Sequence, residues 1–383
     1  MDEIAIYLHW PFCKSKCPYC DFASCSPRDT SLYEPFGNYL LEDLKRSIDV
    51  IGNRCIKSVF FGGGTPSLMN PKSIARILDF LSKNHRLEDD VEITLEANPA
   101  TFNKNKMQNF QNAGINRLSL GIQSFSCNNL KFLGRIYDGT QAIKAADIVS
   151  KIFKNFSIDL MYGYKIQTLK DLKYDLMTSI NFGCKHISCY QLTFEKNTPF
   201  YNQMLLGNIK KINEPEEIKR YNFIENILKN HHILRYEVSN YALPGFESKH
   251  NLAYWRYDDY LGVGSSAHSR LTINNSKNEM VKIYDPFLWK NALNQHKTTF
   301  SCVNVLTEKE KLEEIILLGL RLVNGITMDD LYAQISREVV DKIISKQKLK
   351  FLREKKLIMN ENIRLTSDGF KKMDAVIEFL LNS

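Results

Sequence analysis

Short apolar runs alternate with helical patterns along roughly the first half of the chain. Six runs are rich in β-branched and aromatic residues: IAIYL (4–8), SVFF (58–61), VEITLE (91–96), RLSLG (117–121), SIDLM (157–161) and HISCYQL (186–192). Runs of this kind, bounded by polar or turn residues, predict buried β-strands. Helical spacing of apolar residues recurs between them, with Ile74, Ile77, Leu78 and Leu81 in 71–84, and with Leu172, Leu176 and Ile180 in 171–182.

This alternation of strand and helix predicts an α/β fold. Strands joined by helices form a parallel sheet with right-handed crossovers, either as an open wound sheet or as a barrel that can be incomplete. In both architectures ligands bind at the carboxyl ends of the strands. We therefore expect any functional site to lie where these six runs end.

The pattern changes after residue 200. Residues 233–271 are dense in Tyr, Trp, Gly and His, and we expect irregular structure beside a site there. A helix is predicted from Thr307, because Glu310 completes a capping box with it. Two further helical patterns and a strand-like NIRLT (362–366) follow, and together they resemble a winged-helix unit. We thus predict three units: 1–210, a connecting segment 211–300, and a helical cap 301–383.

Composition fits a globular chain, since 44% of its 383 residues are apolar. No stretch approaches the roughly eighteen consecutive apolar residues of a membrane-spanning helix. The start, MDEIAIYLHWPFC, has two acids where a signal peptide would carry basic residues. Nine cysteines without a regular pairing pattern are typical of a reducing compartment. We therefore expect a cytoplasmic protein.

The formal charge of +8 comes mostly from scattered lysines. The densest basic run extends from Lys346 to Lys356, and such a run is more often a solvated helix face than a nucleic-acid contact. No aromatic stacking platform or DNA-reading helix accompanies it. We do not expect nucleic acid as a partner.

Three cysteines directly follow the first predicted strand. Cys13, Cys17 and Cys20 stand at C-x3-C-x2-C spacing in HWPFCKSKCPYCDF. They could bind zinc if His9 or Cys25 completed a tetrahedron. They could instead hold an iron–sulfur cluster through thiolates. Three thiolates on a four-iron cluster leave one iron open to a small molecule with an amine and a carboxylate, which we favour as the reason for the missing fourth cysteine.

Chemistry-bearing residues also follow the other predicted strands. FFGGGTP closes the second strand, Glu96 ends the third, Gln123 follows the fourth and Asp159 lies in the fifth. Glycines allow a backbone to approach a ligand closely, although a triple glycine alone indicates a tight turn just as well. We expect these residues to converge at one edge of the sheet.

Taken jointly, these motifs resemble the radical S-adenosylmethionine (SAM) enzymes. Nine further segments between residue 4 and about residue 271 resemble the oxygen-independent coproporphyrinogen oxidase branch: YLHWPFCKSKCPYCDF, FFGGGTPSLM, LEANP, NRLSLGIQSF, LGRIYD, IDLMYG, YQLTFEKNTPFY, YEVSNYA and HNLAYWRYDDYLGVGSSAH. The resemblance implies an incomplete (β/α)6 barrel with a C-terminal helical, winged-helix-like domain. It also implies a [4Fe-4S] cluster and SAM as cofactors.

Within that branch, two features favour the heme chaperones of the HemW type over the true dehydrogenases. The dehydrogenases resemble C-x3-C-x2-C-x-C behind an N-terminal extension, whereas this chain has Phe22 at the fourth position and twelve residues before Cys13. HNLAYW resembles the chaperones' heme-ligation motif and implies His250 as the iron ligand, with Tyr254 and Trp255 as flat apolar surface. Without the resemblance, His250 would be read as a structural loop histidine.

The resemblance also implies the residues of each cofactor site. Cys13, Cys17 and Cys20 would bind the cluster. Backbone groups at Gly63, Gly64 and Thr65 would hold the methionine end of SAM, and Glu96 its ribose. The remaining pocket residues would be Tyr7, Tyr19, Gln123, Arg135 and Asp159. On their own, Arg135 could pair with a surface acid, Asp159 could be a cap, and Tyr19 could only cover the cluster.

One segment departs from the family pattern. After IDLMYG the family usually reads LPGQT, whereas this chain has YKIQT at residues 164–168. Loss of the Pro-Gly turn predicts a looser loop near the SAM pocket.

The expected function is therefore that of a heme chaperone on a radical SAM scaffold. It would bind heme and transfer it to an acceptor protein, with respiratory cytochromes as the family expectation. We expect no catalytic residues of its own and no coproporphyrinogen dehydrogenase activity. The alternative is an oxygen-independent coproporphyrinogen III oxidase. Peripheral membrane association is compatible with the sequence, which does not define the oligomeric state.

Overall fold

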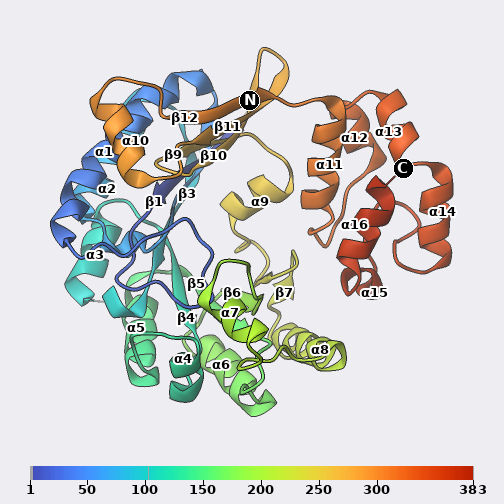
Figure 1. Ribbon diagram of the computed structural model, residues 1–383, viewed down its shortest axis with the longest axis horizontal. Coiled ribbons are helices and arrows are strands. Elements are labelled where there is room, and N and C mark those ends of the chain that lie inside the picture. The colour runs from blue at the N-terminus through green and yellow to red at the C-terminus, as the bar shows by residue number, and fades with distance from the viewer. Residues whose placement is uncertain (1–2, 102, 383) are drawn as a thin grey trace.

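One twelve-stranded sheet organises the computed structural model, which describes residues 3–101 and 103–382 (Figure 1). The strands are β1 (Glu3–Trp10), β2 (Cys55–Gly63), β3 (Leu87–Ala97), β4 (Arg117–Gln123), β5 (Asn155–Tyr162), β6 (His186–Gln191), β7 (Leu234–Arg235), β8 (Asn240–Ala242), β9 (Tyr260–Val263), β10 (His268–Ile273), β11 (Ser276–Lys282) and β12 (Phe300–Val305). Their spatial order is β12-β11-β10-β9-β1-β2-β3-β4-β5-β6-β8-β7.

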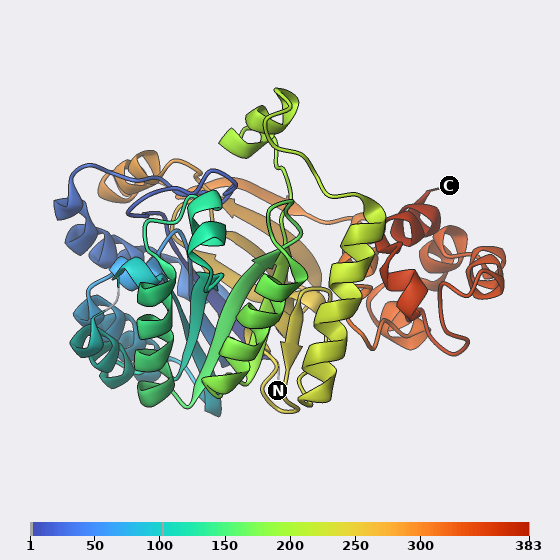
Figure 2. The ribbon, with the colours of Figure 1, turned by 90° about the horizontal axis from the view of Figure 1, so that it is seen from below.

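The six predicted strands are β1 to β6, which lie side by side in chain order and pair in parallel. The helices between them are α1 (Tyr33–Ser47), α2 (Pro71–Asn84), α3 (Lys104–Asn112), α4 (Cys127–Phe132), α5 (Gly139–Ile152) and α6 (Leu169–Asn181). These helices lie on the outer face of the curved sheet (Figure 2). The predicted incomplete (β/α)6 barrel is confirmed.

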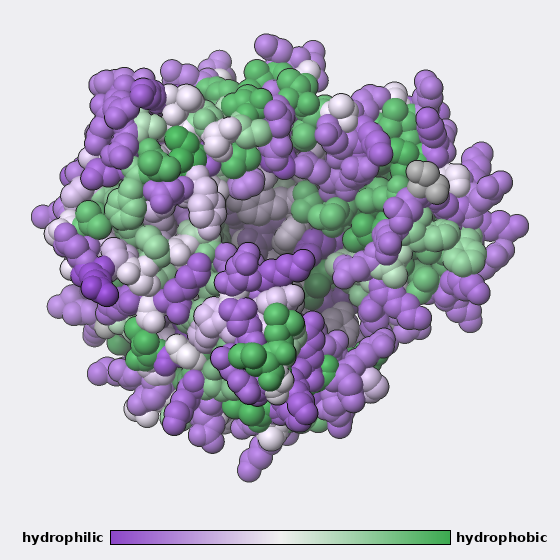
Figure 3. All heavy atoms as spheres, viewed as in Figure 1, coloured by the Kyte–Doolittle hydropathy of each residue, from purple (hydrophilic) through white to green (hydrophobic). Residues whose placement is uncertain are grey.

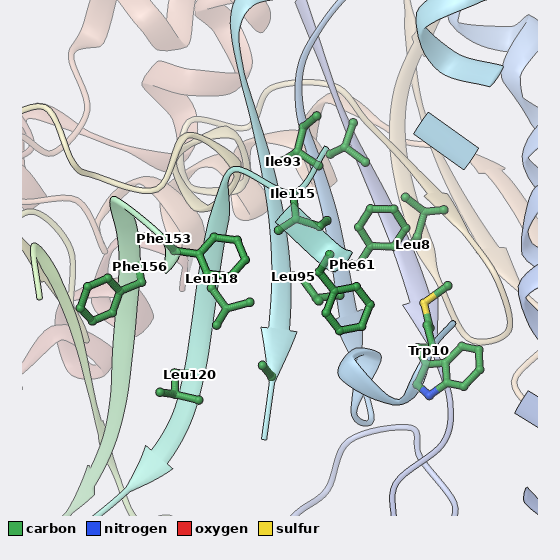
Figure 4. Close-up of a cluster of buried hydrophobic side chains, with 14 of the residues drawn as sticks. Leu8, Trp10, Phe61, Ile93, Leu95, Ile115, Leu118, Leu120, Phe153 and Phe156 are labelled. Atoms are coloured by element: carbon green, nitrogen blue, oxygen red, sulfur yellow. The ribbon is translucent and has the colours of Figure 1, made fainter. Parts of the chain in front are cut away.

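Alternation along each central strand separates a core face from a site face. Leu95, Leu118 and Leu120 point to the outer side, where they join a continuous apolar core with Trp10 and Phe61 (Figure 4). Neighbouring residues on the same strands point to the opposite side, because successive side chains of a strand alternate between faces. That inner face carries the polar residues of the site.

The predicted helical stripe in 71–84 packs against this core. Ile74, Ile77, Leu78 and Leu81 of α2 are all buried. In α6, Leu172 and Leu176 are buried, and Ile180 packs against the core while partly exposed.

The segment 233–271 is more regular than its composition predicts. It contains β7, β8, β9, part of β10, and α9 (Lys249–Trp255). β9 pairs in parallel with β1, and β10 to β12 extend the sheet antiparallel. Asn274 and Asn275 both have positive φ, 50° and 62°, and join β10 to β11 in a tight hairpin. Asparagine pairs suit such turns, so this signal was present in the sequence.

The remaining helices before the C-terminal region are α7 (Pro199–Leu205), α8 (Glu214–Asn230) and α10 (Pro286–Asn294). None of the helices in residues 3–101 and 103–382 combines the length and apolar character needed to cross a lipid bilayer.

The C-terminal helices have a core of their own, formed by apolar residues between Leu312 and Leu380 together with Tyr257. They are α11 (Glu308–Gly319), α12 (Met328–Gln334), α13 (Arg337–Ile343), α14 (Lys346–Glu354), α15 (Ser367–Phe370) and α16 (Met373–Leu381). The predicted capping box of α11 is present, since Thr307 Oγ1 accepts from the Glu310 amide at 3.3 Å.

Three details of this region differ from the prediction. Five helices follow α11 instead of two, because short helices lack a full apolar repeat. NIRLT forms isolated bridges, Ile326 with Ile363 and Ile358 with Leu365, instead of a named strand. Residues 300–305 belong to β12 of the sheet, so the helical region begins at Glu308. The functional division at 210 and 300 stays a prediction.

The basic run 346–356 is mostly α14. Leu349 and Leu352 of this helix are buried, whereas Lys350 is exposed and 3.9 Å from Glu354. This arrangement is that of a solvated helix face packed on one side.

Candidate cofactor site

A cavity of about 410 Å³ opens at the carboxyl ends of the central strands. The space-filling view shows a hollow near the middle of this face (Figure 3). Its walls include most of the predicted site residues: Cys13, Cys17, Cys20, Tyr19, Gly63, Gly64, Thr65, Glu96, Gln123, Arg135 and Asp159. The structure therefore brings these predicted residues together around one cavity, while Tyr7 and His250 are not among its lining residues. Their roles stay a prediction.

The three cysteines stand on the loop that follows β1. A bridge between Phe12 and Cys25 closes this loop, with the Cys13 amide donating to the Cys25 carbonyl at 2.9 Å. All three thiols are free. Burial raises the pKa of Cys13, and it raises the pKa of Cys20 to about 11. A thiolate here therefore requires a compensating positive charge, such as that of bound iron.

A zinc site completed by His9 does not fit this geometry. His9 Nδ1 is 3.0 Å from Tyr7 Oη, and its Nε2 is 2.9 Å from the Ala23 carbonyl oxygen. Burial lowers the pKa of His9 to about 4. Over residues 3–101 and 103–382, no group of three or more His, Cys, Asp or Glu side chains is placed to hold a single metal ion.

The glycine turn fits a larger group held by the three thiols. A Cβ added to Gly64 would lie 3.1 Å from Cys13 Sγ and 2.7 Å from the Phe12 carbonyl oxygen. A side chain at this position would therefore fill the space beside the sulfur. Three free thiols facing a backbone without side chains suit an iron–sulfur cluster with a small-molecule ligand.

Backbone hydrogen bonds tie the glycine turn to its neighbours. The Gly64 amide donates to the Trp10 carbonyl at 2.7 Å, and the Thr65 amide donates to the Phe12 carbonyl at 2.8 Å. Gly63 has φ 112° and donates to Glu96 Oε2 at 3.1 Å. These three amides are engaged within the protein, so a ligand would meet other groups of the turn.

Two buried carboxyl groups face the cavity from β3 and β5. Burial, with the negative charge of Asp159 beside it, raises the pKa of Glu96 to about 8, although the Gly63 amide opposes this shift. Burial also raises the pKa of Asp159, whose carboxylate accepts from Ser119 Oγ at 2.8 Å. The Glu96 carboxyl therefore holds a proton at neutral pH in the ligand-free cavity, and a cationic ligand group would favour its release.

Arg135 does not pair with a surface acid. Its Nη1 donates to Cys17 Sγ at 3.0 Å and to Tyr19 Oη at 3.2 Å, and its Nε donates to Tyr137 Oη at 3.0 Å. A guanidinium beside a sulfur stabilises negative charge there. Gln123, also in the wall, has φ 67°, a strained value for a non-glycine residue that is common at functional sites.

The YKIQT segment has its own set of fixed contacts. Tyr164 is 1% exposed, and its ring stacks on Phe132 at 5.2 Å. Gln167 accepts from the Gly163 amide at 3.2 Å and donates to the Met161 carbonyl at 3.1 Å. These bonds span the turn where the family has Pro-Gly, and the looser loop stays a prediction.

His250 is packed away from solvent on α9. It is 1% exposed, with Nδ1 2.9 Å from Ser58 Oγ and Nε2 2.9 Å from Tyr254 Oη. Its ring stacks on Phe60 with centroids 4.8 Å apart. Burial lowers the pKa of His250 to about 3, so the imidazole is neutral. Both ring nitrogens are hydrogen-bonded in this arrangement.

Tyr7 is not among the residues that line the cavity. Its ring is 6.2 Å from those of Phe60 and His250, and its hydroxyl bonds to His9.

Several wall residues were missed by sequence reasoning. Phe60, Arg117, Ser119, His186, Ser188 and Asn251 all line the cavity. Four of them could have been found, because Arg117 and Ser119 of β4, and His186 and Ser188 of β6, stand two residues apart on one strand face. Asn251 lies far along the chain and gives no comparable signal.

Comparisons with known proteins agree with this geometry. Residues 7–176 match the Radical SAM superfamily, and residues 306–370 match the HemN C-terminal domain. The chain is 40% identical over 275 residues to the heme chaperone HemW of Buchnera aphidicola subsp. Schizaphis graminum, covering 71% of each chain. It is 32% identical to HemW of Bacillus subtilis, covering 95% of each.

A solved structure, that of coproporphyrinogen III oxidase (HemN) from Escherichia coli, shares the fold. The TM-score is 0.82 at 18% identity, covering 100% of this chain and 90% of that one. The superfamily match agrees with the cysteine loop and the glycine turn, and the match to the Bacillus subtilis HemW, over 95% of this chain, spans both the barrel and the C-terminal helices. The chain therefore belongs to the radical SAM superfamily and, within it, to the HemW family.

Proposed function

We propose that this protein is a heme chaperone, which binds heme and passes it to an acceptor protein. The observation that carries the proposal is its similarity to relatives named heme chaperones, which reaches 95% of each chain for the Bacillus subtilis protein. Respiratory cytochromes are the acceptor class that we propose. The chain's own residues would bind and orient ligands without acting as catalytic acids or bases.

The cavity would hold the cofactors of the superfamily. Cys13, Cys17 and Cys20 would bind the [4Fe-4S] cluster, with Arg135 beside Cys17 balancing its negative charge. SAM would occupy the adjacent space, which Glu96 and Asp159 line. When bound, cluster and SAM supply one-electron chemistry, while the protein positions and shields them.

Phe22 supports the chaperone over the dehydrogenase. It takes the position of the dehydrogenases' fourth cysteine, lines the cavity and is 59% exposed. A phenylalanine cannot supply the thiolate that the dehydrogenase pattern has at this position.

His250 stays our proposed heme ligand, although both of its ring nitrogens are hydrogen-bonded in this structure. Neutral imidazole is the form that binds heme iron. Because Ser58 and Tyr254 occupy both ring nitrogens, ligation requires one of these bonds to break. Tyr254 lies on the same helix as His250, so a shift of α9 would break the bond to Ser58. Heme binding would then be accompanied by movement of this helix.

The test is a heme titration of anaerobically reconstituted protein, comparing wild type with His250→Ala. His231→Ala is the matched control, because His231 is an exposed histidine on another element. We expect stoichiometric binding by wild type and the control, with loss of the axial-histidine spectrum in His250→Ala. Absence of heme binding by wild type, or protoporphyrinogen formed from coproporphyrinogen with SAM and reductant, would contradict the proposal.

A further inference from the structure

Asn251 is the one cavity-lining residue, within the part of the chain that the structure describes, that comes from beyond Glu195. Every other wall residue belongs to the cysteine loop, to the strands β2 to β6, or to the segments that follow them. The side-chain amide of Asn251 makes no hydrogen bond to any described residue, and the side chain is half-buried. An amide offers two donors and one acceptor. The wall therefore presents an amide from α9 that has no hydrogen-bond partner among the described residues.

The amino-terminal end of α9 is held to the sheet beside this wall. The Glu92 carboxylate accepts from Ser248 Oγ at 3.2 Å and from the amides of Lys249 and His250, both at 3.1 Å. Glu92 Oε2 is also 3.7 Å from Nε of Arg117, a buried wall residue. The position of Asn251 is thus coupled to the cavity through its neighbours as well.

The carboxyl-terminal end of α9 is held to the C-terminal helices. The Arg321 guanidinium lies 4.5 Å from the centre of the Trp255 ring, and α9 packs against α11. Tyr257, with φ 61°, is buried in the C-terminal core. Figure 1 shows α9 between the sheet and α11. One short helix therefore joins the cavity wall to the C-terminal region.

His250 shares this helix and contacts a residue of the same wall. Its ring stacks on Phe60, which lines the cavity. A shift of α9 that broke the His250–Ser58 bond would also move the adjacent Asn251 and the ring that stacks on Phe60.

We propose that Asn251 hydrogen-bonds to SAM in the cavity, so that bound SAM holds α9 in the arrangement in which His250 is hydrogen-bonded to Ser58. The second half rests on the proposed function, because it takes His250 as the heme ligand. SAM and heme then oppose each other's binding. By thermodynamic linkage, each weakens the other's affinity by the same factor.

The contact is tested by SAM affinity in anaerobically reconstituted, heme-free full-length protein. Equilibrium dialysis with labelled SAM compares wild type, Asn251→Ala, Asn251→Asp and an exposed control, Asn84→Ala, at the end of α2. Loss of one or two hydrogen bonds predicts a Kd about fivefold weaker in Asn251→Ala, with the same cluster absorbance as wild type. Wild-type affinity in Asn251→Ala would overturn the contact. Asn251→Asp keeps the size of the side chain and an acceptor, so weaker binding in that variant too would assign the contact to the amide donors.

The coupling is tested by measuring SAM affinity in heme-loaded and heme-free protein. We expect heme to weaken SAM binding in wild type, SAM to weaken heme binding by the same factor, and the factor to approach one in Asn251→Ala. An unchanged SAM Kd on heme loading, in protein whose heme binding requires His250, would overturn the coupling. Heme binding that ignores His250→Ala would overturn the ligand assignment instead, while the Asn251 contact would stand on its own measurement.

Discussion

The cavity wall and helix α9 differ in how their functional groups are presented. In the wall, the three thiols, Glu96 and Asp159 face open space at the carboxyl ends of adjacent strands. On α9, His250 is buried, hydrogen-bonded at both nitrogens and stacked on Phe60. The cavity can accept a ligand without rearrangement, whereas α9 would have to move before His250 could bind one. If our proposal holds, a ligand in the cavity therefore controls whether His250 can bind heme.

The largest effect is expected when one of the three cysteines of the cavity wall is replaced. Cys13→Ala should abolish the cluster and SAM binding completely, because the remaining two thiolates cannot hold a four-iron cluster. Heme binding through His250 should persist, since α9 does not contact Cys13. Iron and sulfide analysis with parallel SAM and heme titrations measures this. Cys25→Ala is the control, and loss of the cluster in that variant would show that the fourth ligand is a cysteine.

The next effect breaks the attachment of α9. Glu92→Ala removes the acceptor of three hydrogen bonds and leaves the buried Arg117 without its carboxylate. We expect a loss of about 3–5 kcal/mol in the free energy of unfolding, measured by urea denaturation. Glu88→Ala removes an acid that pairs with the half-exposed Lys249 at 3.4 Å, and should cost less than about 1 kcal/mol. Equal losses would mean that Glu92 does not anchor the helix.

The next prediction concerns the pH dependence of stability that the buried Glu96 carboxyl produces. The pKa of Glu96 is raised from 4.5 to about 8 in the folded protein. Its folded state therefore binds the proton more tightly than the unfolded state, and stability from this group is present below pH 4.5 and lost as the pH rises through 8.

Glu96→Gln should remove this dependence. Relative to the variant, ligand-free wild type should lose roughly 5 kcal/mol of unfolding free energy between acidic and alkaline pH. Urea denaturation across that range compares the two proteins. If the unfolding free energies of the two proteins changed with pH in the same way, the pKa of Glu96 would not be raised in the folded protein.

The smallest effect is expected when the hydrogen bond from Tyr254 to His250 is removed. Tyr254→Phe removes the hydroxyl that occupies Nε2 while keeping the ring, and should tighten heme binding about threefold because one hydrogen bond no longer competes. Tyr332→Phe removes a hydroxyl bonded to exposed Asp341 and should leave heme affinity unchanged. Weaker heme binding in Tyr254→Phe would indicate that Tyr254 assists the bound state instead of opposing it.

Sequence patterns predicted the strands around the cavity, but they did not predict the contacts that bury His250. Strand periodicity placed β1 to β6 and the residues at their ends, because parallel strands bring their carboxyl ends to one edge. The packing of His250 depends on Ser58, which lies 192 residues earlier in the chain. Local spacing carries no information about such a contact. β9 was missed for a related reason, since its four residues become a strand only by pairing with β1.

The place of β1 in the sheet has a consequence for biosynthesis. Of the described strands β1 is translated before the others, yet it pairs on one side with β2 and on the other with β9, whose residues end at Val263. The loop that bears Cys13 continues directly from β1, so its lasting shape depends on a partner translated some two-thirds of the way along the chain. We expect the nascent chain to remain without its metal centre until that point, which makes cluster insertion a late step in maturation.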